Sequence, residues 1–131
     1  MLTALFDHLD PERFVSLTTF RSSGSAISTP VWVGLDDGAL VVTTPAGSGK
    51  VKRLRNNPEV ELRPSSRTGS VDAGAPVAQG TVELLTDPSS RKRPTRILRR
   101  KYGLEYVVVM GIEPLTRPRH CDRIKLRITP A

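Results

Sequence analysis

Short segments that alternate apolar and polar residues are the feature that most constrains the fold of this chain. In the segment 13–20, Val15 and Leu17 alternate with Ser16 and Thr18. A period of two places every second side chain on the same face of a β-strand, so this segment predicts a strand with one buried face. Comparable segments recur along the sequence, and together they predict six strands over residues 13–20, 26–35, 39–44, 59–64, 77–85 and 122–128. In the last of these, the apolar residues Ile124, Leu126 and Ile128 alternate with Arg123, Lys125 and Arg127, and we expect the basic residues to face solvent or a groove.

Turn-forming residues between these segments indicate antiparallel neighbours. The sequence Asp-Asp-Gly at 36–38 is typical of a tight hairpin. Pro30 has no N–H for a ladder and predicts an edge strand or a bulge, and Gly80 predicts a bulge in the fifth strand. Six such strands would leave exposed edges unless the sheet curls on itself. We therefore expect a mainly β fold, a small closed or partly closed β-barrel with flanking helices.

Three further segments predict helices. Residues 1–13 have apolar residues at helical spacing. The basic segment that follows the third strand predicts a helix ending near Asn57, because a proline comes next. The segment 87–103 is predicted to be helical in its second half, with Pro94 near the first turn and Gly103 as the terminator.

Length and charge narrow the class of protein. The chain has 131 residues, of which 37% are apolar, which suits one domain over residues 1–131. It has 20 Lys and Arg residues against 13 Asp and Glu, and the net charge of +7 favours anionic partners. The single cysteine, Cys121, cannot form an internal disulfide. No segment is apolar enough for a membrane span and no secretory signal is apparent, so we expect a cytoplasmic protein without a membrane partner.

The stretch TTPAGSGKVKRLRNNP, residues 43–58, concentrates positive charge behind a turn of small residues. A P-loop would need glycine at position 44 and a hydroxyl at position 51, where this chain has Thr44 and Val51, so a P-loop triphosphatase is excluded. A small-residue turn that opens a helix still presents free N–H groups, and Lys50 and Arg53 share a helix face. The stretch is therefore a candidate anion site, with a solvated basic helix as the alternative.

Side chains that usually perform catalysis are scattered. His8, His120 and Cys121 belong to no cluster with metal-ligand spacing, and no serine lies in a nucleophile elbow, so we assign no catalytic residue and no metal. An enzyme of this sequence would take its chemistry from a cofactor. Trp32 is by default a core residue, although its strand could present hydroxyls and backbone groups to a planar ring.

The run 91–101 is the second basic region of the chain. It contains seven basic residues and no acid. Such a run predicts a solvated face, or a contact with nucleic acid or an acidic tail. Only 5% of the residues are aromatic, which gives base stacking little support. Specific nucleic-acid binding is therefore not expected.

Several short motifs occur in the order found in a known family. The motifs L-T-T-F, S-T-P-V-W, D-G, V-T-T and G-K-V-K-R-L-R-N-N-P are followed by VAQGTVELL, RRKYGLE and IKLRITP. This order resembles the pyridoxamine-phosphate-oxidase-like, deazaflavin-dependent oxidoreductases, and the resemblance covers nearly the whole chain. It implies an FMN-binding-like split β-barrel, and a homodimer with two cofactor sites at the subunit interface. The loop 65–76 and the basic segment 91–94 depart from the family pattern.

The resemblance also implies which residues bind the cofactor. The turn and basic helix match the positions that hold the cofactor phosphate in the family. The strand with S-T-P-V-W matches the one that lies along the flavin or deazaflavin ring, and the two threonines of V-T-T match positions near the phosphate or the ribityl chain. The implied cofactor-binding set is Ser28, Thr29, Pro30, Val31, Trp32, Thr43, Thr44, Gly49, Lys50, Lys52 and Arg53.

The choice of cofactor follows from charge. Branches of the family use FMN, coenzyme F420 or haem, and F420 has a phosphate and a polyglutamate tail. The net charge of +7 and the form of the basic motif favour F420, with FMN as the alternative. The expected function is an F420H2-dependent oxidoreductase that transfers a hydride from reduced deazaflavin to an unsaturated or quinone-like small molecule. The alternatives are a non-catalytic F420, FMN or haem binding or carrier protein, and a basic nucleic-acid-binding domain.

Overall fold

The structure is a computed structural model that describes residues 6, 9, 11–45, 47–104, 106 and 123–130. Within these residues, seven strands form a single antiparallel sheet. The strands are β1 (Phe14–Phe20), β2 (Ala26–Val31), β3 (Val33–Asp36), β4 (Ala39–Pro45), β5 (Glu59–Ser65), β6 (Ala78–Leu85) and β7 (Arg123–Pro130). Two helices accompany them, α1 (Gly49–Asn56) and α2 (Pro88–Tyr102). The protein is therefore mainly β, as predicted.

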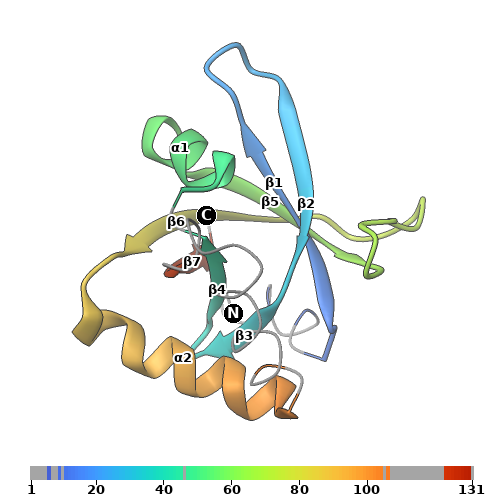
Figure 1. Cartoon of the computed structure of the whole chain (residues 1–131). Coiled ribbons are helices and arrows are strands. Elements are labelled where there is room, and N and C mark those ends of the chain that lie inside the picture. Colours follow the sequence, from blue (N-terminus) through green and yellow to red (C-terminus); the bar gives the residue numbers. More distant parts are fainter. Residues whose placement is uncertain are drawn as a thin grey trace.

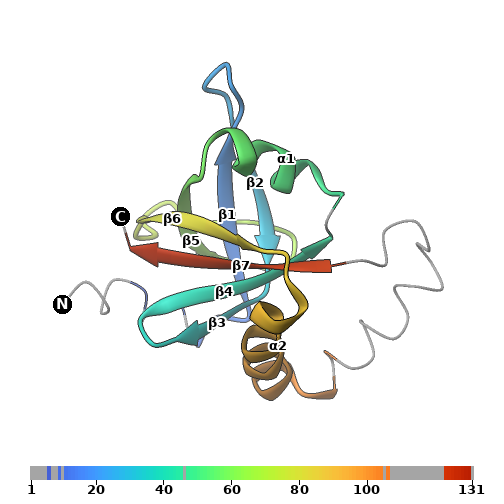
Figure 2. The ribbon, with the colours of Figure 1, turned by 90° about the vertical axis from the view of Figure 1, so that its left-hand side faces the viewer.

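The order of the strands explains how the sheet closes. It runs β2-β1-β5-β6-β7-β4-β3, so β2 and β3 are the two edges. These two strands are consecutive in the chain, and only Trp32 separates them. Because β2 pairs with β1 and β3 pairs with β4, the sheet curls until its edges meet at this residue (Figures 1 and 2). The result is the split β-barrel that the sequence predicts.

The prediction of one strand over residues 26–35 is wrong. β2 ends at Val31 with β1 as its partner, and β3 begins at Val33 with β4 as its partner. The residue between them, Trp32, belongs to neither ladder. Alternation of apolar residues does not reveal such a change of partner, because the segment stays extended on both sides of it. Pro30 lies in the edge strand β2, which confirms one of the two placements predicted for it.

The interior of the barrel is filled by the inward-facing residues of the strands. Ile124, Leu126 and Ile128 of β7 are all buried, which confirms the alternation predicted for this strand. Helix α1 adds Val51 and Leu54, which lie three residues apart on the face turned to the core. Burying side chains of this size stabilises the fold by about 1.5–3 kcal/mol each, and it fixes α1 against the barrel.

Helix α2 covers the outer face of β3 and β4. Leu98 and Tyr102 form a second apolar cluster there, against which Trp32 packs. The close approach depends on Gly34, because a Cβ at this position would lie 2.6 Å from Cγ2 of Ile97. Helices α1 and α2 lie at opposite ends of the barrel (Figures 1 and 2).

Helix α2 is longer than the sequence predicts. It begins at Pro88, where the fixed φ of proline suits the first helical position, and Pro94 lies inside it. The prediction placed Pro94 near the start because proline removes one hydrogen bond from a helix interior. In the structure Pro94 is buried, so packing offsets part of that loss. Gly103, with a φ of +57°, ends the helix as predicted.

The glycine predictions had different outcomes. Asp37 and Gly38 have φ angles of 51° and 82°, as a tight hairpin requires, so the predicted turn is confirmed. The bulge predicted at Gly80 is wrong, because this residue pairs regularly with both β5 and β7. Glycine is needed there for a different reason, since a Cβ would lie 2.5 Å from Cγ2 of Ile128.

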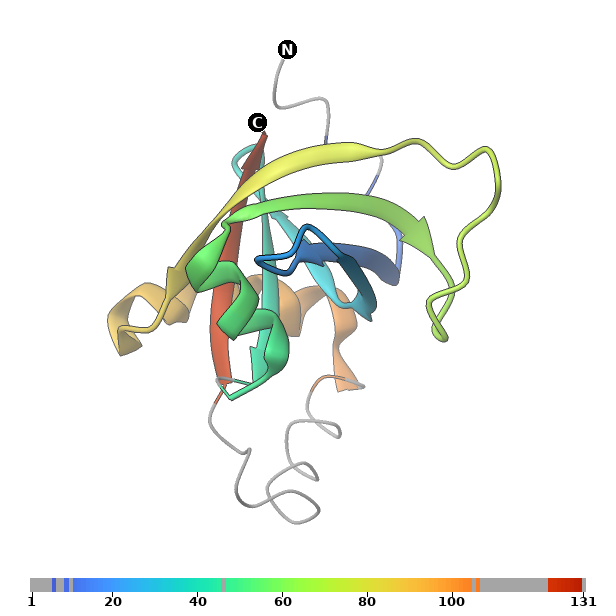
Figure 3. The ribbon, with the colours of Figure 1, turned by 90° about the horizontal axis from the view of Figure 1, so that it is seen from above.

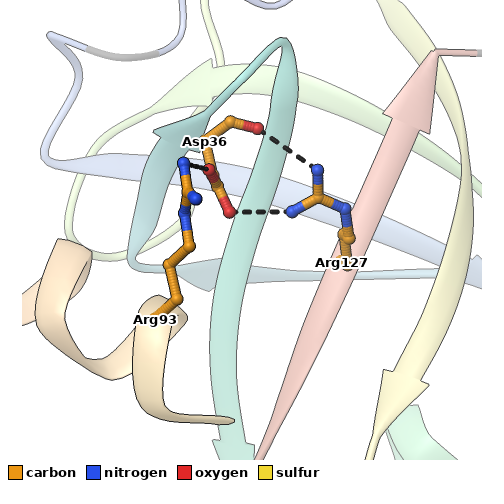
Figure 4. A network of polar contacts seen from close by, with 3 residues as sticks. All are labelled: Asp36, Arg93 and Arg127. Carbon is orange, nitrogen blue, oxygen red and sulfur yellow. Dashed lines mark hydrogen bonds and ion pairs between the residues drawn. The ribbon is translucent and has the colours of Figure 1, made fainter. Parts of the chain in front are cut away.

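The basic residues of β7 do not all face solvent or a groove, contrary to the prediction. Lys125 is only 5% exposed, and its Nζ donates a hydrogen bond to Oγ1 of Thr43 at 2.9 Å. Arg127 pairs with the buried carboxylate of Asp36 at 2.8 Å, and Arg93 of α2 forms an ion pair with the other carboxylate oxygen, also at 2.8 Å (Figure 4). The alternation identified the apolar face correctly, but it could not show that the opposite face is also partly covered.

The remaining parts of the chain add little to the core. The helix predicted over residues 1–13 lies mostly outside the described residues, although Phe6 and Leu9 are described and fully buried. The loop 66–77 between β5 and β6 extends away from the barrel (Figure 3). In the part of the chain that the structure describes, no helix has the length and apolar character needed to cross a bilayer.

Candidate functional site

The basic stretch singled out in the sequence forms the end of β4, a turn and helix α1. Ser48 is the N-cap, and its Oγ accepts a hydrogen bond from the N–H of Val51 at 3.5 Å. Serine is favoured there because it satisfies an N–H group that the first helical turn leaves without a partner. Thr44 of β4 shares a hydrogen bond with the Ser48 hydroxyl at 3.3 Å. Two hydroxyls thus border a first turn that contains no acidic residue.

Arg53 folds back over the start of this helix. Its Nε donates a hydrogen bond to Oγ1 of Thr19 at 2.6 Å, and Thr19 is fully buried at the end of β1. Its Nη1 lies 2.9 Å from the position that a Cβ on Gly49 would take, so glycine leaves the room that the guanidinium uses. Of the nitrogens in the Arg53 guanidinium, only Nε has a hydrogen-bond partner among the described residues. The Nη groups are therefore placed beside the helix N-terminus with donors available for an anion.

The two lysines of the motif occupy different positions on α1. Lys50 lies three residues before Arg53, so both side chains are on the same face of the helix. Lys50 is half-buried. Lys52 is exposed and lies on another face. The structure thus groups Lys50 with Gly49 and Arg53, and it leaves Lys52 beside this group rather than in it.

The two threonines of β4 have their side chains on opposite faces of the strand. Thr44 shares a face with the inward residues and reaches Ser48, as described above. Thr43 points to the opposite face, because successive residues of a strand alternate. There it accepts the hydrogen bond from buried Lys125. Only Thr44 therefore borders the start of α1.

The edge strand β2 lies next to the same group through β1. Ile27 is the residue paired with Thr19, which holds Arg53. Ser28 is exposed and shares a hydrogen bond of 2.7 Å with Thr18. Thr29 is half-buried on the inward face, and its Oγ1 is buried without a hydrogen-bond partner among the described residues. An unsatisfied buried hydroxyl costs about 1–3 kcal/mol, so this atom indicates a place where a bound ligand would supply the missing partner.

The side chains of Pro30, Val31 and Trp32, which were also predicted to bind the cofactor, point in different directions. Pro30 is exposed and Val31 is buried. The Trp32 indole stacks on the ring of Tyr102, with centroids 4.4 Å apart and planes 13° apart. The Tyr102 hydroxyl accepts a hydrogen bond from the N–H of Val33 at 3.0 Å, which fixes the stack against β3. The side chain of Trp32 is thus packed under α2, and only its backbone stays with the edge strands.

These residues fit a phosphate-bearing, flavin-type cofactor on two observations. Arg53 and the first turn of α1 place several N–H donors and a positive charge at one point, with the Thr44 and Ser48 hydroxyls beside them. Arginine and helix N-termini both favour phosphate groups. The unsatisfied hydroxyl of Thr29 lies on the strand expected to follow the ring. No group of three or more potential metal-ligating side chains occurs among the described residues.

Two members of this group were missed by sequence reasoning. Thr19 was only one residue of the strand predicted over residues 13–20, and Ser48 was treated only as part of a small-residue turn. Ser48 could have been found, because serine just before a helix is a common N-cap. Thr19 could not, because nothing local connects it with an arginine that is distant in the sequence.

Comparison with known proteins gives a family and a fold. The family model described as pyridoxamine 5'-phosphate oxidase matches residues 2–131. No curated protein sequence gives a significant match. A conserved hypothetical protein from Mycobacterium tuberculosis has a TM-score of 0.70 at 20% identity, over 99% of this chain and 80% of that one.

Two further solved structures have the same fold. A protein described as an F420 reductase has a TM-score of 0.64 at 22% identity, over 96% of this chain and 92% of that one. The haem storage protein of Vibrio cholerae has a TM-score of 0.66 at 11% identity, over 92% and 83%. At these identities the likeness concerns the fold, whereas the family model spans almost the entire sequence. The chain belongs to the pyridoxamine 5'-phosphate oxidase family of split β-barrel proteins.

Proposed function

We propose that this protein is an F420H2-dependent oxidoreductase that reduces an unsaturated or quinone-like small molecule. The proposal depends chiefly on the position of Arg53, which is anchored by Thr19 and folded over Gly49 at the start of α1. An arginine that served only solubility would extend into solvent, since an exposed charge contributes little to stability. This one is held where a phosphate would meet both its Nη groups and the N–H groups of the helix.

Two observations support F420 over FMN. The net charge of +7 and the basic helix α1 suit a cofactor with several negative charges, because opposite charges attract over a Debye length of about 8 Å at physiological salt. One solved structure that shares the fold is described as an F420 reductase. FMN remains the alternative cofactor.

The residues of the site would bind and orient the cofactor rather than transfer protons. The cofactor supplies a hydride when it is reduced. Arg53 and the first turn of α1 would hold its phosphate, the hydroxyl of Thr29 would meet the polar edge of the ring, and the backbone of β2 would lie along it. The apolar wall of the barrel behind β2 would limit the access of water. Because the described residues of the site include no acidic side chain, the proton that accompanies the hydride would come from solvent.

We also propose a homodimer in which a second subunit completes the cofactor site. β2 is an edge of the sheet, and among the described strands none pairs with its outer side. A ring lying along this edge would be open to solvent on one face unless another chain covered it. Light scattering should give twice the 14.3 kDa chain mass at micromolar concentration. A monomer at that concentration would contradict the shared site.

Titration of the purified protein with F420 and with FMN tests the binding part of the proposal. Calorimetry should give a dissociation constant in the micromolar range for F420, about 8 kcal/mol of binding free energy, and weaker binding of FMN. Stronger binding of FMN would move the protein to the alternative cofactor. Absence of binding by both would contradict the proposal.

Turnover separates an enzyme from a carrier. A site whose described residues include no acidic side chain also suits a protein that only binds the cofactor, so this second function needs its own test. Reduced F420 mixed with menadione should be oxidised faster with the protein than without it. Saturable binding with no acceleration for menadione or for an unsaturated lactone would favour the carrier.

A further inference from the structure

The outward face of α2 carries charge that the proposed cofactor site does not use. The helix contains no acidic residue, and five bases whose burial the structure describes are exposed: Lys92, Arg93, Arg96, Arg99 and Arg100. Arg93 is balanced by its ion pair with Asp36. Bases in the last turn, such as Arg99 and Arg100, interact favourably with the negative end of the helix dipole. This general effect does not account for Arg96, which lies in the middle of the helix.

A pocket lies between this helix and the edge strand β3. Its volume is about 310 Å³. Gly34, Leu35 and Ile97 form its apolar part, and Arg96, Arg100 and Lys101 form its basic part. Lys101 is committed to the fold, because its Nζ donates hydrogen bonds to two backbone carbonyls at 2.7 Å each. The pocket is within the size range of small-molecule sites and combines apolar surface with a few converging charges, as such sites do.

Arg96 and Arg100 are the two groups that a ligand would meet. They lie four residues apart on the same helix face, where two like charges repel each other. Among the described residues, neither guanidinium has a hydrogen-bond or ion-pair partner, and no acid lines the pocket. An oxyanion bound between them would remove this repulsion and accept charge-assisted hydrogen bonds from both. Leu35 and Ile97 would at the same time contact an apolar group attached to the oxyanion.

We propose that this pocket binds an organic oxyanion, a carboxylate or phosphate attached to an apolar body. The site is separate from the cofactor site, since α2 and α1 lie at opposite ends of the barrel (Figures 1 and 2). The proposal does not depend on F420, because it uses neither Arg53 nor β2. A substrate or an effector of this chemical class would satisfy both halves of the pocket.

The test uses 1-naphthoate as the probe, titrated calorimetrically into the full chain without cofactor. Naphthoate should bind saturably, while 1-naphthamide, which has no charge, and inorganic phosphate, which has no apolar body, should each bind at least about tenfold more weakly. Arg96→Ala and Arg100→Ala should each weaken naphthoate about tenfold. Lys92→Ala and Arg99→Ala remove the same charge from the same helix outside the pocket, and they should change the affinity less than about twofold.

Three results would overturn the proposal. The first is no saturable binding of naphthoate at millimolar concentration. The second is an equal loss of naphthoate affinity in all four single variants, which would indicate a surface that binds polyanions nonspecifically. A 16-base-pair DNA duplex would then bind, and Lys92→Ala would weaken DNA binding as much as Arg96→Ala. The third is equal binding of naphthoate and naphthamide, which would leave the arginines without a role. Because all four residues are exposed, thermal unfolding should confirm that every variant folds.

Discussion

The two basic helices of this barrel use the same kind of charge in different ways. In α1, Arg53 turns toward the barrel, is anchored on the buried Thr19 and lies over Gly49. In α2, Lys92, Arg96, Arg99 and Arg100 are exposed, while Tyr102 and Leu98 hold the helix to the sheet. By the number of charges alone, α2 would be the better candidate for the phosphate site. The hydrogen bonds of the individual guanidinium groups favour α1 instead, because an arginine that is fixed by a buried partner is already oriented for a ligand, whereas an arginine surrounded by solvent is not.

The largest expected effect concerns how the α2 end of the molecule is anchored. Arg127→Ala should lower the free energy of unfolding by about 2–4 kcal/mol, because it removes a partner from the buried carboxylate of Asp36. Arg93→Ala is the matched control. Its side chain is 69% exposed, so its loss should cost less than about 1 kcal/mol. Urea unfolding measures both, and equal costs would mean that the helix-borne arginine anchors the network as much as the strand does.

The α1 end can be tested through cofactor affinity. Arg53→Ala should weaken F420 binding by about 2–3 kcal/mol, because it removes a charge-assisted contact and the group that orients the site. Arg55→Ala removes the same charge from an exposed position on the same helix and should change the affinity by less than about 0.5 kcal/mol. Calorimetric titration decides the matter, and similar losses in the two variants would reduce α1 to a general basic surface.

A smaller effect is expected where glycine makes room for the guanidinium. Gly49→Ala places a Cβ 2.9 Å from Nη1 of Arg53, so the arginine end has to move. Because that end is flexible, stability should hardly change, while F420 affinity should fall by about 1 kcal/mol through the displaced hydrogen bonds. Gly74→Ala is the control, since a Cβ there meets nothing within 4 Å. Unchanged affinity in Gly49→Ala would show that the position of Nη1 is not used.

The smallest effect should come from α2. Arg96→Ala is expected to leave F420 affinity within about 0.5 kcal/mol, because an exposed charge at the far end of the barrel is largely screened. The same calorimetric assay applies. A loss as large as that in Arg53→Ala would mean that the cofactor reaches both basic regions, and the contrast between the two helices would disappear.

The sequence predicted those features that depend on neighbours in the chain. The hairpin at Asp37 and Gly38 depends on local backbone preferences, and it was found. Lys50 and Arg53 were grouped because helix geometry places residues three apart on one face. Helix α1 and most strand boundaries followed from alternation and from proline positions in the same way.

Features that depend on distant partners could not be predicted. Gly80 was read as a bulge, whereas the structure needs it because β7 brings Ile128 against it. Lys125 was expected at a solvent or groove face, but the register between β4 and β7 places it against Thr43. The hydrogen bond from Arg53 to Thr19, on which the candidate site depends, is of the same kind.

The position of β7 has a consequence for how the chain reaches this fold. The hairpins β1–β2 and β3–β4 pair segments that are close in sequence, and such contacts form within microseconds. In the sheet, β7 alone among the described strands joins β4 and β3 to the rest, and it pairs with a strand far from it in sequence. Contacts between distant segments are slow because a long loop has to close first. We therefore expect the capture of β7 to limit the rate of refolding, and substitutions in β7 to slow folding more than substitutions in the β3–β4 hairpin.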